Sequence, residues 1–337
     1  MKVLSLFDGI SCARVALERA GIAVESYLAS EVDPKAIQVT QSHWPDTIQL
    51  GDVRGVRIPA GQIELLIGGS PCTDLSIAKA GRQGLEGEHS SLFWEYVRVL
   101  RETNPRWFIL ENVASMPKKD KEIITQELGV EPVLFDASLV SAQSRKRLFW
   151  TNIPFVLPPD RGIMLKDILQ PDEEVEESMN VKGNLHITNS GNKIGYMGNT
   201  DAQSGRVYSI DGKSVALSAQ GRGKGAKTGL YLCGYKELRR LDENGVRHDG
   251  NTNYPLVKRY EFNATGKANT LTTMTEDKIV IATPEMRIRK LTPIECERLQ
   301  GLPDGYTAGI AKTHRYKCLG NAFNVDVIAH ILTHLPH

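Results

Sequence analysis

Cys72 is the residue of this sequence whose type and setting most clearly suggest chemistry. It ends the run Gly68-Gly69-Ser70-Pro71-Cys72, which follows the apolar residues 65–67. A thiolate is a strong nucleophile, and a loop of glycine and proline after a buried strand can expose it. A cysteine is more often an inert core residue, but core cysteines are rare in such loops. We therefore predict that Cys72 is a catalytic nucleophile.

Glu111 and two arginines are candidates for acid–base chemistry and for binding a polar group. Glu111 follows the apolar residues 107–110. It could begin a helix, or it could act as a general acid whose pKa is raised by burial. Arg145 and Arg147 are two residues apart, so alternation along an extended chain places them on one face. The alternative for the arginines is a basic edge at the protein surface.

Three loops with acidic residues indicate a nucleotide-like cofactor. The turn Phe7-Asp8-Gly9-Ile10-Ser11 follows an apolar run and opens a helix, where small residues let a ligand approach the backbone. Glu31-Val32-Asp33 follows the second apolar run, at the distance where a carboxylate can hydrogen-bond a ribose. Gly51-Asp52-Val53 adds a later carboxylate. Each loop alone could be a plain turn or a surface acid, but their order predicts an adenosine-type cofactor.

The elements that must position these residues alternate along the first 150 residues. Short apolar runs predict buried strands at 3–7, 24–29, 65–67, 107–110 and 148–150. Helical spacing of apolar residues predicts helices at 12–20, 34–43, 92–103 and 120–128. Strands that alternate with helices predict a parallel, doubly wound α/β sheet, whose ligands bind at the carboxyl ends of the strands.

The chain after Pro158 has a different character. Residues 178–285 are rich in Gly, Asn, Thr and Ser, with strand-like pieces at 206–210, 231–233 and 279–282. Residues 208–219 resemble residues 261–273, which suggests a duplicated hairpin or a chance similarity. Between 178 and 300, Lys and Arg outnumber Asp and Glu, which is typical of a DNA-facing domain or of an unevenly charged surface. Helical patterns return at 292–299 and 325–335.

Composition restricts the class of protein. The 337 residues suffice for one or two domains, and 41% hydrophobic and 24% charged residues are ordinary for a globular protein. The net charge of +1 neither favours nor excludes a nucleic acid. The five cysteines lie far apart, which predicts reduced thiols of a cytoplasmic protein. No apolar run has the length of a signal peptide or membrane span.

Taken in order, these motifs resemble those of the cytosine-5 DNA methyltransferases, and the resemblance covers the whole chain. It rests on Gly69-Ser70-Pro71-Cys72, Glu111-Asn112-Val113 and Gln143-x-Arg145-x-Arg147. Arg289-Lys290-Leu291-Thr292-Pro293 and Gly320-Asn321-Ala322-Phe323 resemble two later motifs. Details of the first loop and of the Cys72 loop are similar to the branch that includes the animal de novo enzymes. The lack of chromatin-reading domains favours a prokaryotic or phage enzyme.

The resemblance implies a fold, a cofactor and roles for the site residues. The fold would be a doubly wound mixed sheet of the S-adenosylmethionine-dependent methyltransferase type, with a smaller, mostly β target-recognition domain. Residues 1–170 and 315–337 would form the catalytic domain, and residues 171–314 the target-recognition domain. Cys72 would attack cytosine, Glu111 would act at ring nitrogen 3, Arg145 would hold the base oxygen, and Arg147 would support Glu111. The residues expected to hold S-adenosylmethionine are Phe7, Asp8, Gly9, Ile10, Ser11, Glu31, Val32, Asp52, Val53, Ser70, Pro71, Asn321 and Phe323.

The expected substrate is double-stranded DNA, from which the target cytosine is flipped out. The residues expected to contact DNA are Thr73, Gln220, Arg222, Lys224, Lys227, Thr270 and Thr272. Two positions depart from many relatives, namely Ser11 in place of a second glycine and Thr73 in place of glutamine. We expect no metal and no membrane, and we favour a monomer. A restriction endonuclease companion is left open by the sequence.

Three alternatives to a DNA methyltransferase stay open. A transfer-RNA cytosine methyltransferase would share the scaffold, but the long second region favours a reader of DNA sequence. An inactive module that binds cofactor or DNA would not require Cys72, Glu111 and both arginines together. A nicotinamide-dependent dehydrogenase would account for the doubly wound sheet, but it would leave the Pro-Cys loop and the paired arginines without a role.

Overall fold

The computed structural model describes residues 1–70, 92–171, 174–181, 185–198, 201–202, 205–217, 228–240, 256–261 and 285–336. Contacts divide the described residues into two compact units. The first lies within Met1–Ile163, Val215–Gln220 and Pro293–His337, and the second within Met164–Ser214 and Gly221–Thr292. The division of labour between a catalytic and a target-recognition domain stays a prediction.

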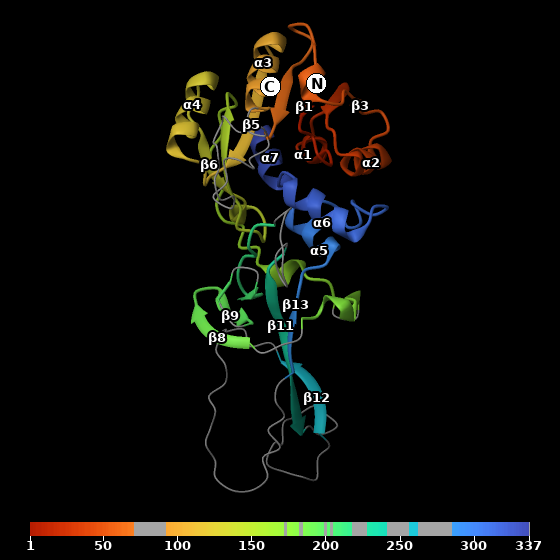
Figure 1. The fold of residues 1–337 in the computed structure, drawn as a ribbon, viewed down its shortest axis with the longest axis vertical. Helices are drawn as coiled ribbons and strands as arrows, with labels where there is room; N and C mark the ends of the chain where they lie inside the picture. Colours follow the sequence, from red (N-terminus) through yellow and green to blue (C-terminus); the bar gives the residue numbers. More distant parts are fainter. Residues whose placement is uncertain are drawn as a thin grey trace. The chain divides into compact units, whose positions relative to one another are not determined.

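In the described part of the first unit, seven strands form one sheet in the order β3-β2-β1-β4-β5-β7-β6 (Figure 1). The parallel strands are β1 (Lys2–Leu6), β2 (Ser26–Ser30), β3 (Ile48–Gln49), β4 (Leu65–Gly68) and β5 (Trp107–Val113). β7 (Lys146–Thr151) runs antiparallel to both β5 and β6 (Val133–Asp136). The predicted doubly wound mixed sheet is confirmed. The strand order reverses at β1 and β4, which is where doubly wound sheets bind their ligands.

The strands of this sheet are apolar because both of their faces are covered. Every residue of β4 is buried. Alternate residues of neighbouring strands, such as Leu4, Leu66 and Leu110, belong to one hydrophobic cluster. The helices that complete this cluster are α3 (Leu92–Thr103), through Phe93 and Tyr96, and α4 (Lys118–Leu128).

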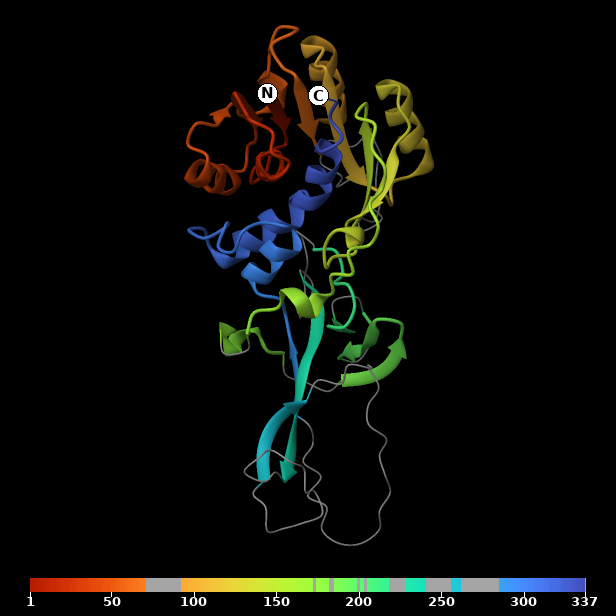
Figure 2. The same ribbon diagram turned by 180° about the vertical axis from the view of Figure 1, so that it is seen from behind.

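Other helices of this unit are α1 (Cys12–Arg19), α2 (Pro34–His43), α5 (Pro293–Leu299), α6 (Lys312–Asn321) and α7 (Val325–Leu332). α1 packs against α7, which joins the start of the chain to its end. Both views show the N and C marks in this unit (Figure 2). Among the described residues, no helix is long and apolar enough to cross a membrane.

The predicted elements agree closely with the observed ones where the periodicity is strong. The predicted helices at 34–43 and 92–103 have the observed ends of α2 and α3. The short strand β6 and the helix α6 were not predicted, and the strand expected before Gly51 is the two-residue β3. α6 buries only Cys318, Leu319 and Gly320 among its residues, so its sequence carries little amphipathic pattern.

The described part of the second unit is mostly β, as expected. Its sheet has the order β12-β11-β10-β9-β8, and β13 pairs with β11. The strands are β8 (Leu185–Ser190), β9 (Lys193–Met197), β10 (Arg206–Ser209), β11 (Leu230–Arg240), β12 (Leu256–Glu261) and β13 (Glu285–Arg289). A small core of Met197, Val207, Leu230 and Ile288 holds the sheet together. The second half of the predicted repeat and the predicted strand at 279–282 lie outside the described residues.

Candidate active site

Several predicted site residues lie at the carboxyl edge of the first unit's sheet. The loops that follow the parallel strands β1, β2, β4 and β5 meet at this edge. β7 runs the opposite way and therefore begins there, with Glu111 opposite Phe149 and Val113 opposite Arg147. Because side chains alternate along a strand, Glu111 and Arg147 are diagonal neighbours on the same face.

Glu111 and Arg147 form an ion pair in which Arg147 Nε lies 2.7 Å from Glu111 Oε1. The side chains are only 13% and 18% exposed, respectively. Water therefore screens the two charges weakly, and the guanidinium holds the carboxylate in one orientation. The geometry agrees with the predicted support of Glu111 by Arg147, while the chemical roles of both stay predictions.

The second oxygen of Glu111 faces the loop that leads to Cys72. A Cβ atom added to Gly69 would lie 3.2 Å from Glu111 Oε2 and 2.7 Å from Cε1 of Phe323. Glycine is therefore required at position 69, because any side chain would displace the Phe323 ring. The chain runs from this close contact through Ser70 into Pro71, Cys72 and Thr73, which lie outside the described residues.

Asn112 is a site residue to which sequence reasoning assigned no role. Its Nδ2 donates to Ser70 Oγ at 3.1 Å, and its Oδ1 accepts from the Val113 amide at 2.8 Å. The buried amide thus ties the end of β5 to the loop after β4. The only signal in the sequence was its position next to Glu111 at the end of a predicted strand.

Arg145 makes different contacts from Arg147, although the exposed Lys146 between them agrees with the predicted alternation. Its guanidinium is buried and donates to the carbonyls of Gly320 at 3.3 Å and Ala322 at 3.1 Å. It also lies 3.5 Å from the carbonyl of Leu217. Arg145 therefore anchors the turn between α6 and α7, and its predicted contact with the base oxygen stays a prediction.

The loop after β1 has an unusual backbone that local hydrogen bonds stabilise. Phe7, Gly9 and Ser11 all have φ near +60°, a conformation that costs side-chain-bearing residues about 1 kcal/mol or more. The hydroxyl of Ser11 donates to the Asp8 carboxylate and lies 2.9 Å from Thr40 Oγ1. The left-handed backbone at Ser11 is thus supported by the serine hydroxyl, which bonds within the loop.

Asp8 is the buried acid of this loop. Tyr27 donates its hydroxyl to Asp8 Oδ1 at 2.7 Å, and Ser11 donates to Oδ2. Burial raises the pKa of Asp8 to about 6, against the lowering effect of these hydrogen bonds. The Asp8 side chain faces inward, so a cofactor in this loop would meet the backbone rather than this carboxylate.

Glu31 joins the loop after β1 to the loop after β2. Its carboxylate accepts from the amides of Gly9 at 2.8 Å, Val32 at 2.7 Å and Asp33 at 2.8 Å. Three backbone donors fix both oxygens of the carboxylate at the edge of the sheet. Beside it, the apolar side chain of Val32 is 67% exposed.

The loop after β3 presents the third predicted acid. The Ser30 hydroxyl donates to the Gly51 carbonyl at 2.7 Å, which keeps this loop next to the one that carries Val32. The Asp52 side chain is 50% exposed and caps η1 (Val53–Gly55), a short 3-10 helix. Val53 itself packs into the core, so only its backbone could contact a ligand.

These loops have the chemical groups that S-adenosylmethionine requires. The exposed apolar surface of Val32 can cover a face of the adenine ring, and Glu31 and Asp52 can accept hydrogen bonds from ribose hydroxyls and an adenine amino group. Gly9, with positive φ and open space around it, allows close approach to the backbone. Asn321 is exposed at the end of α6, and Phe323 is buried against Gly69.

Tyr306 is a second residue that sequence reasoning missed. Its hydroxyl donates to the Ile10 carbonyl at 2.9 Å and accepts from Trp44 Nε1 at 3.2 Å. The ring of His43 stacks on it, with centroids 4.0 Å apart. Tyr306 therefore fixes the loop after β1 from a segment almost 300 residues away, a contact that no local pattern could reveal.

The predicted DNA-contacting residues lie outside the described part of the chain, and their roles stay predictions. These are Thr73, Gln220, Arg222, Lys224, Lys227, Thr270 and Thr272. Within the described residues, no group of three or more His, Cys, Asp or Glu side chains is arranged to hold a metal ion.

The chain is similar to known proteins in family, sequence and fold. The family model described as C-5 cytosine-specific DNA methylase matches residues 1–337. The chain is 26% identical to the orphan methyltransferase M.SPRI of Bacillus phage SPR, over 100% of this chain and 98% of that protein. It is also 26% identical to the type II methyltransferase M.HhaI of Haemophilus parahaemolyticus, over 98% of this chain and 93% of that protein.

The fold is similar to that of the methyltransferase EhMeth of Entamoeba histolytica. The TM-score is 0.63 at 14% identity, over 99% of this chain and 97% of that one. At so low an identity the likeness supports the fold alone. The family prediction made from the ordered motifs is confirmed by the family model.

Proposed function

This chain belongs to the family of C-5 cytosine-specific DNA methylases, and we propose that it is a site-specific enzyme that methylates carbon 5 of cytosine in double-stranded DNA. S-adenosylmethionine is the proposed methyl donor. The observation that carries the proposal is the largely buried Glu111–Arg147 pair, in which the second carboxylate oxygen of Glu111 lies near Gly69. Cys72 follows Gly69 by three residues, which supports the proposal that Glu111 and Cys72 act in one site.

Carbon 5 of cytosine is too weak a nucleophile to attack a methyl sulfonium directly. In the proposed reaction the Cys72 thiolate forms a bond to carbon 6, and the electron pair of the 5,6 double bond moves toward carbon 5. Glu111, in its protonated form, donates a hydrogen bond or its proton to ring nitrogen 3, where negative charge develops. S-adenosylmethionine, when bound, supplies the electrophilic methyl group for carbon 5. A base then removes the carbon 5 proton, and the returning electron pair expels Cys72.

Arg147 contributes by holding Glu111 through the 2.7 Å contact. A free cysteine has a pKa near 8.5 and is mostly protonated at neutral pH, so the site must stabilise the thiolate or accept its proton during attack. The target atoms are inaccessible in stacked DNA, and flipping the base costs a few kcal/mol. We propose that the basic segment from Gln220 to Lys227 supplies phosphate contacts for this step, and that Arg222 reads a guanine edge.

The proposal is tested with purified protein, tritiated S-adenosylmethionine and unmethylated genomic DNA, followed by bisulfite sequencing. We expect label in 5-methylcytosine within a fixed sequence context, and no label with Cys72→Ala. Cys233→Ala, a change of another cysteine in β11 of the second unit, is the matched control. DNA that contains 5-fluorocytosine should form a covalent complex with the wild-type protein, because the fluorine cannot leave as the proton does.

Three outcomes would contradict the proposal. Label in transfer RNA but not in DNA would mean that the substrate is wrong. Cofactor binding without transfer to either nucleic acid would favour a binding module. Full activity of Cys72→Ala would refute the covalent mechanism.

A further inference from the structure

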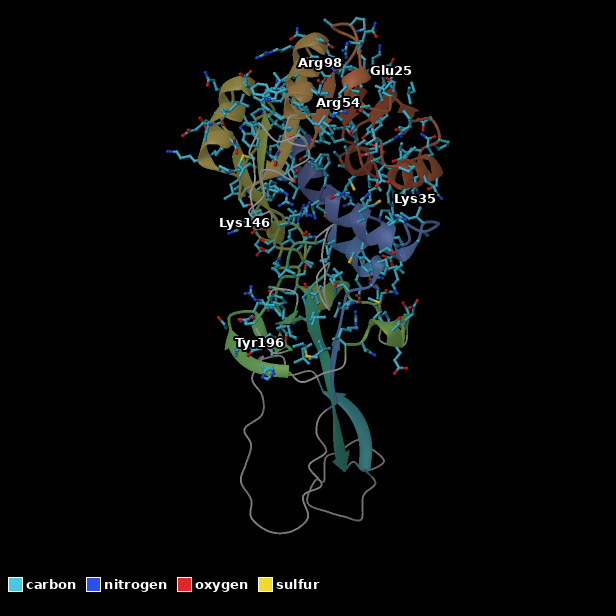
Figure 3. The ribbon with its side chains drawn as sticks, viewed as in Figure 1. Glu25, Lys35, Arg54, Arg98, Lys146 and Tyr196 are labelled. Atoms are coloured by element: carbon cyan, nitrogen blue, oxygen red, sulfur yellow. The ribbon has the colours of Figure 1, made fainter. Side chains whose placement is uncertain are left out.

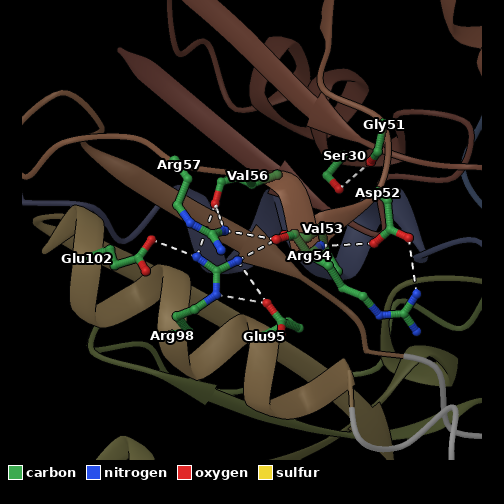
Figure 4. A network of polar contacts seen from close by, with 10 residues as sticks. All are labelled: Ser30, Gly51, Asp52, Val53, Arg54, Val56, Arg57, Glu95, Arg98 and Glu102. Carbon is green, nitrogen blue, oxygen red and sulfur yellow. Dashed lines mark hydrogen bonds and ion pairs between the residues drawn. The ribbon is translucent and has the colours of Figure 1, made fainter.

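Arg98 of α3 lies at the centre of a polar network that the proposed reaction does not use (Figure 4). Its Nη2 donates to the Val53 carbonyl at 2.9 Å, and its Nη1 donates to the Val56 carbonyl at 3.0 Å. These carbonyls belong to the first residue of η1 and to the residue that follows η1. One guanidinium therefore bonds to carbonyls at both ends of this turn.

η1 needs such support because it is very short. Its internal backbone bonds run from Gly55 to Asp52 at 3.0 Å and from Val56 to Val53 at 3.1 Å. A single turn of 3-10 helix is not stable by itself, since it fixes many dihedral angles for few hydrogen bonds. The planar, rigid fork of arginine can hold two carbonyls at a set separation, which a lysine cannot do.

Two carboxylates of the same helix fix the guanidinium in turn. Glu95 Oε2 accepts from Arg98 Nε at 2.8 Å, and Glu102 Oε2 accepts from Nη1 at 2.7 Å. The spacings i−3 and i+4 place both acids on the face of α3 that carries Arg98. The side chain of Arg98 is 24% exposed, so these contacts are only partly screened by water.

Asp52 is the residue that this turn presents at the edge of the sheet. It caps η1 by accepting from the Arg54 amide at 2.9 Å. Its contact with the Arg54 side chain is 3.2 Å between groups that are 59% and 50% exposed, and exposed pairs of this kind contribute little. Arg54 and Arg98 both belong to the first unit (Figure 3). The position of Asp52 therefore depends on the turn. Arg98 holds this turn together with Arg57, whose Nη1 donates to the carbonyls of Arg54 at 2.9 Å and Val56 at 2.7 Å.

We infer that Arg98 is a positioning residue that sets the selectivity of the cofactor site for the adenine amino group, by holding η1 and with it Asp52. The inference rests on the proposed function, and it takes Asp52, rather than Glu31, as the acceptor for that amino group. Arg98 touches neither cofactor nor substrate in this role. Loss of Arg98 should therefore weaken the recognition of adenine more than it weakens DNA binding or slows methyl transfer.

The test compares Arg98→Met with the wild type by calorimetry, using S-adenosylhomocysteine and S-inosylhomocysteine as probes. The inosine analogue has an oxygen in place of the amino group, so it cannot donate to Asp52. We expect Arg98→Met to weaken binding of S-adenosylhomocysteine by about tenfold, the equivalent of one net hydrogen bond. Binding of the inosine analogue should change by less than about threefold, so the preference for adenine falls.

Three further variants separate this role from a general loss of structure. Arg101→Met, also in α3, removes an ion pair with Glu127 of α4 and should leave both affinities unchanged. Glu95→Gln combined with Glu102→Gln keeps both carbonyl bonds of Arg98 and should retain most of the adenine preference. Arg98→Lys should give an intermediate preference, because one ammonium cannot reach both carbonyls.

Steady-state kinetics supply a second readout. Arg98→Met should raise KM for S-adenosylmethionine while kcat and KM for DNA stay within about twofold, because Glu111 and Arg147 lie on β5 and β7 and make no contact with this network. Equal weakening of both probes together with a fall in kcat would mean that Arg98 is merely structural and would overturn the inference. Unchanged affinity for both probes would also overturn it. Failure of the wild-type protein to bind S-adenosylhomocysteine would refute the proposed function itself.

Discussion

Replacement of Asp8 by asparagine tests the electrostatics of the loop after β1. Burial raises the pKa of Asp8 from 3.8 to about 6, and hydrogen bonds from Ser11 and Tyr27 oppose the rise only in part. A difference of about two pKa units between folded and unfolded states corresponds to about 3 kcal/mol. Asparagine keeps the size of the side chain and an acceptor oxygen, but it never ionises.

The direction of the effect follows from which state holds the proton. Between pH 4 and pH 6 the folded protein keeps a proton on Asp8 that the unfolded chain has already lost. The folded state is therefore destabilised as the pH rises through this window, and the full cost of about 3 kcal/mol is present above pH 6. We expect the stability of Asp8→Asn, relative to wild type, to rise by about that amount from below pH 4 to above pH 6.

The assay is unfolding in urea at a series of pH values, followed by tryptophan fluorescence. All four tryptophans lie within residues 1–163, so the signal reports the unit that contains Asp8. Asp304→Asn is the control of opposite sign, because its hydrogen bond with Arg298 lowers the pKa of Asp304. Its destabilising effect should be present at neutral pH and fade as the pH falls below about 4. A difference between Asp8→Asn and wild type that does not vary with pH would refute the reasoning.

Three further substitutions test the rest of the site. Arg147→Met leaves the nearly buried Glu111 without its cation. It should lower the rate constant of methyl transfer by about 100-fold in single-turnover assays, with unchanged affinity for S-adenosylhomocysteine. A normal rate constant would contradict a role for the pair. Gly69→Ala places a methyl group 2.7 Å from the Phe323 ring and should destabilise the protein by about 1–3 kcal/mol, as measured by unfolding in urea. Gly55→Ala is the control and should not destabilise the protein in this way, because no atom lies within 4 Å of its Cβ position. Val32→Asp adds a carboxylate to an exposed side chain beside Glu31 and should weaken S-adenosylhomocysteine binding by about tenfold in calorimetry without a change in unfolding; unaltered affinity would exclude Val32 from the adenine surface.

Local pattern was sufficient for many elements of the first unit. The helices α2 and α3 were predicted with their observed ends, since their apolar residues repeat with a helical period. The apolar runs at 65–67 and 107–110 fall within β4 and β5, because a strand that is buried on both faces needs no polar alternation. The order of the motifs also sufficed to predict the family, which the family model confirms.

Local pattern was insufficient where an element is held mainly by distant partners. α6 buries few of its residues, and Lys317 of this helix pairs with Asp33 at 2.7 Å. β3 has two residues, and β2 is its one partner strand within the described part of the chain. Such short or weakly amphipathic segments acquire their structure from contacts across the fold, and a sequence window does not contain those contacts.

The sequence by itself determined which chemical groups are present, their order, and the alternation that brings them to one edge of a sheet. Only the tertiary structure decided which partner each group contacts and whether the group is buried or exposed. The reversed direction of β7 brings Arg147 to Glu111, while Arg145, two residues earlier, binds the turn after α6. Asp8 is buried and Asp52 is exposed, although both follow apolar runs. The physical reason is that burial and pairing depend on which distant segments pack together, and this is a property of the whole fold.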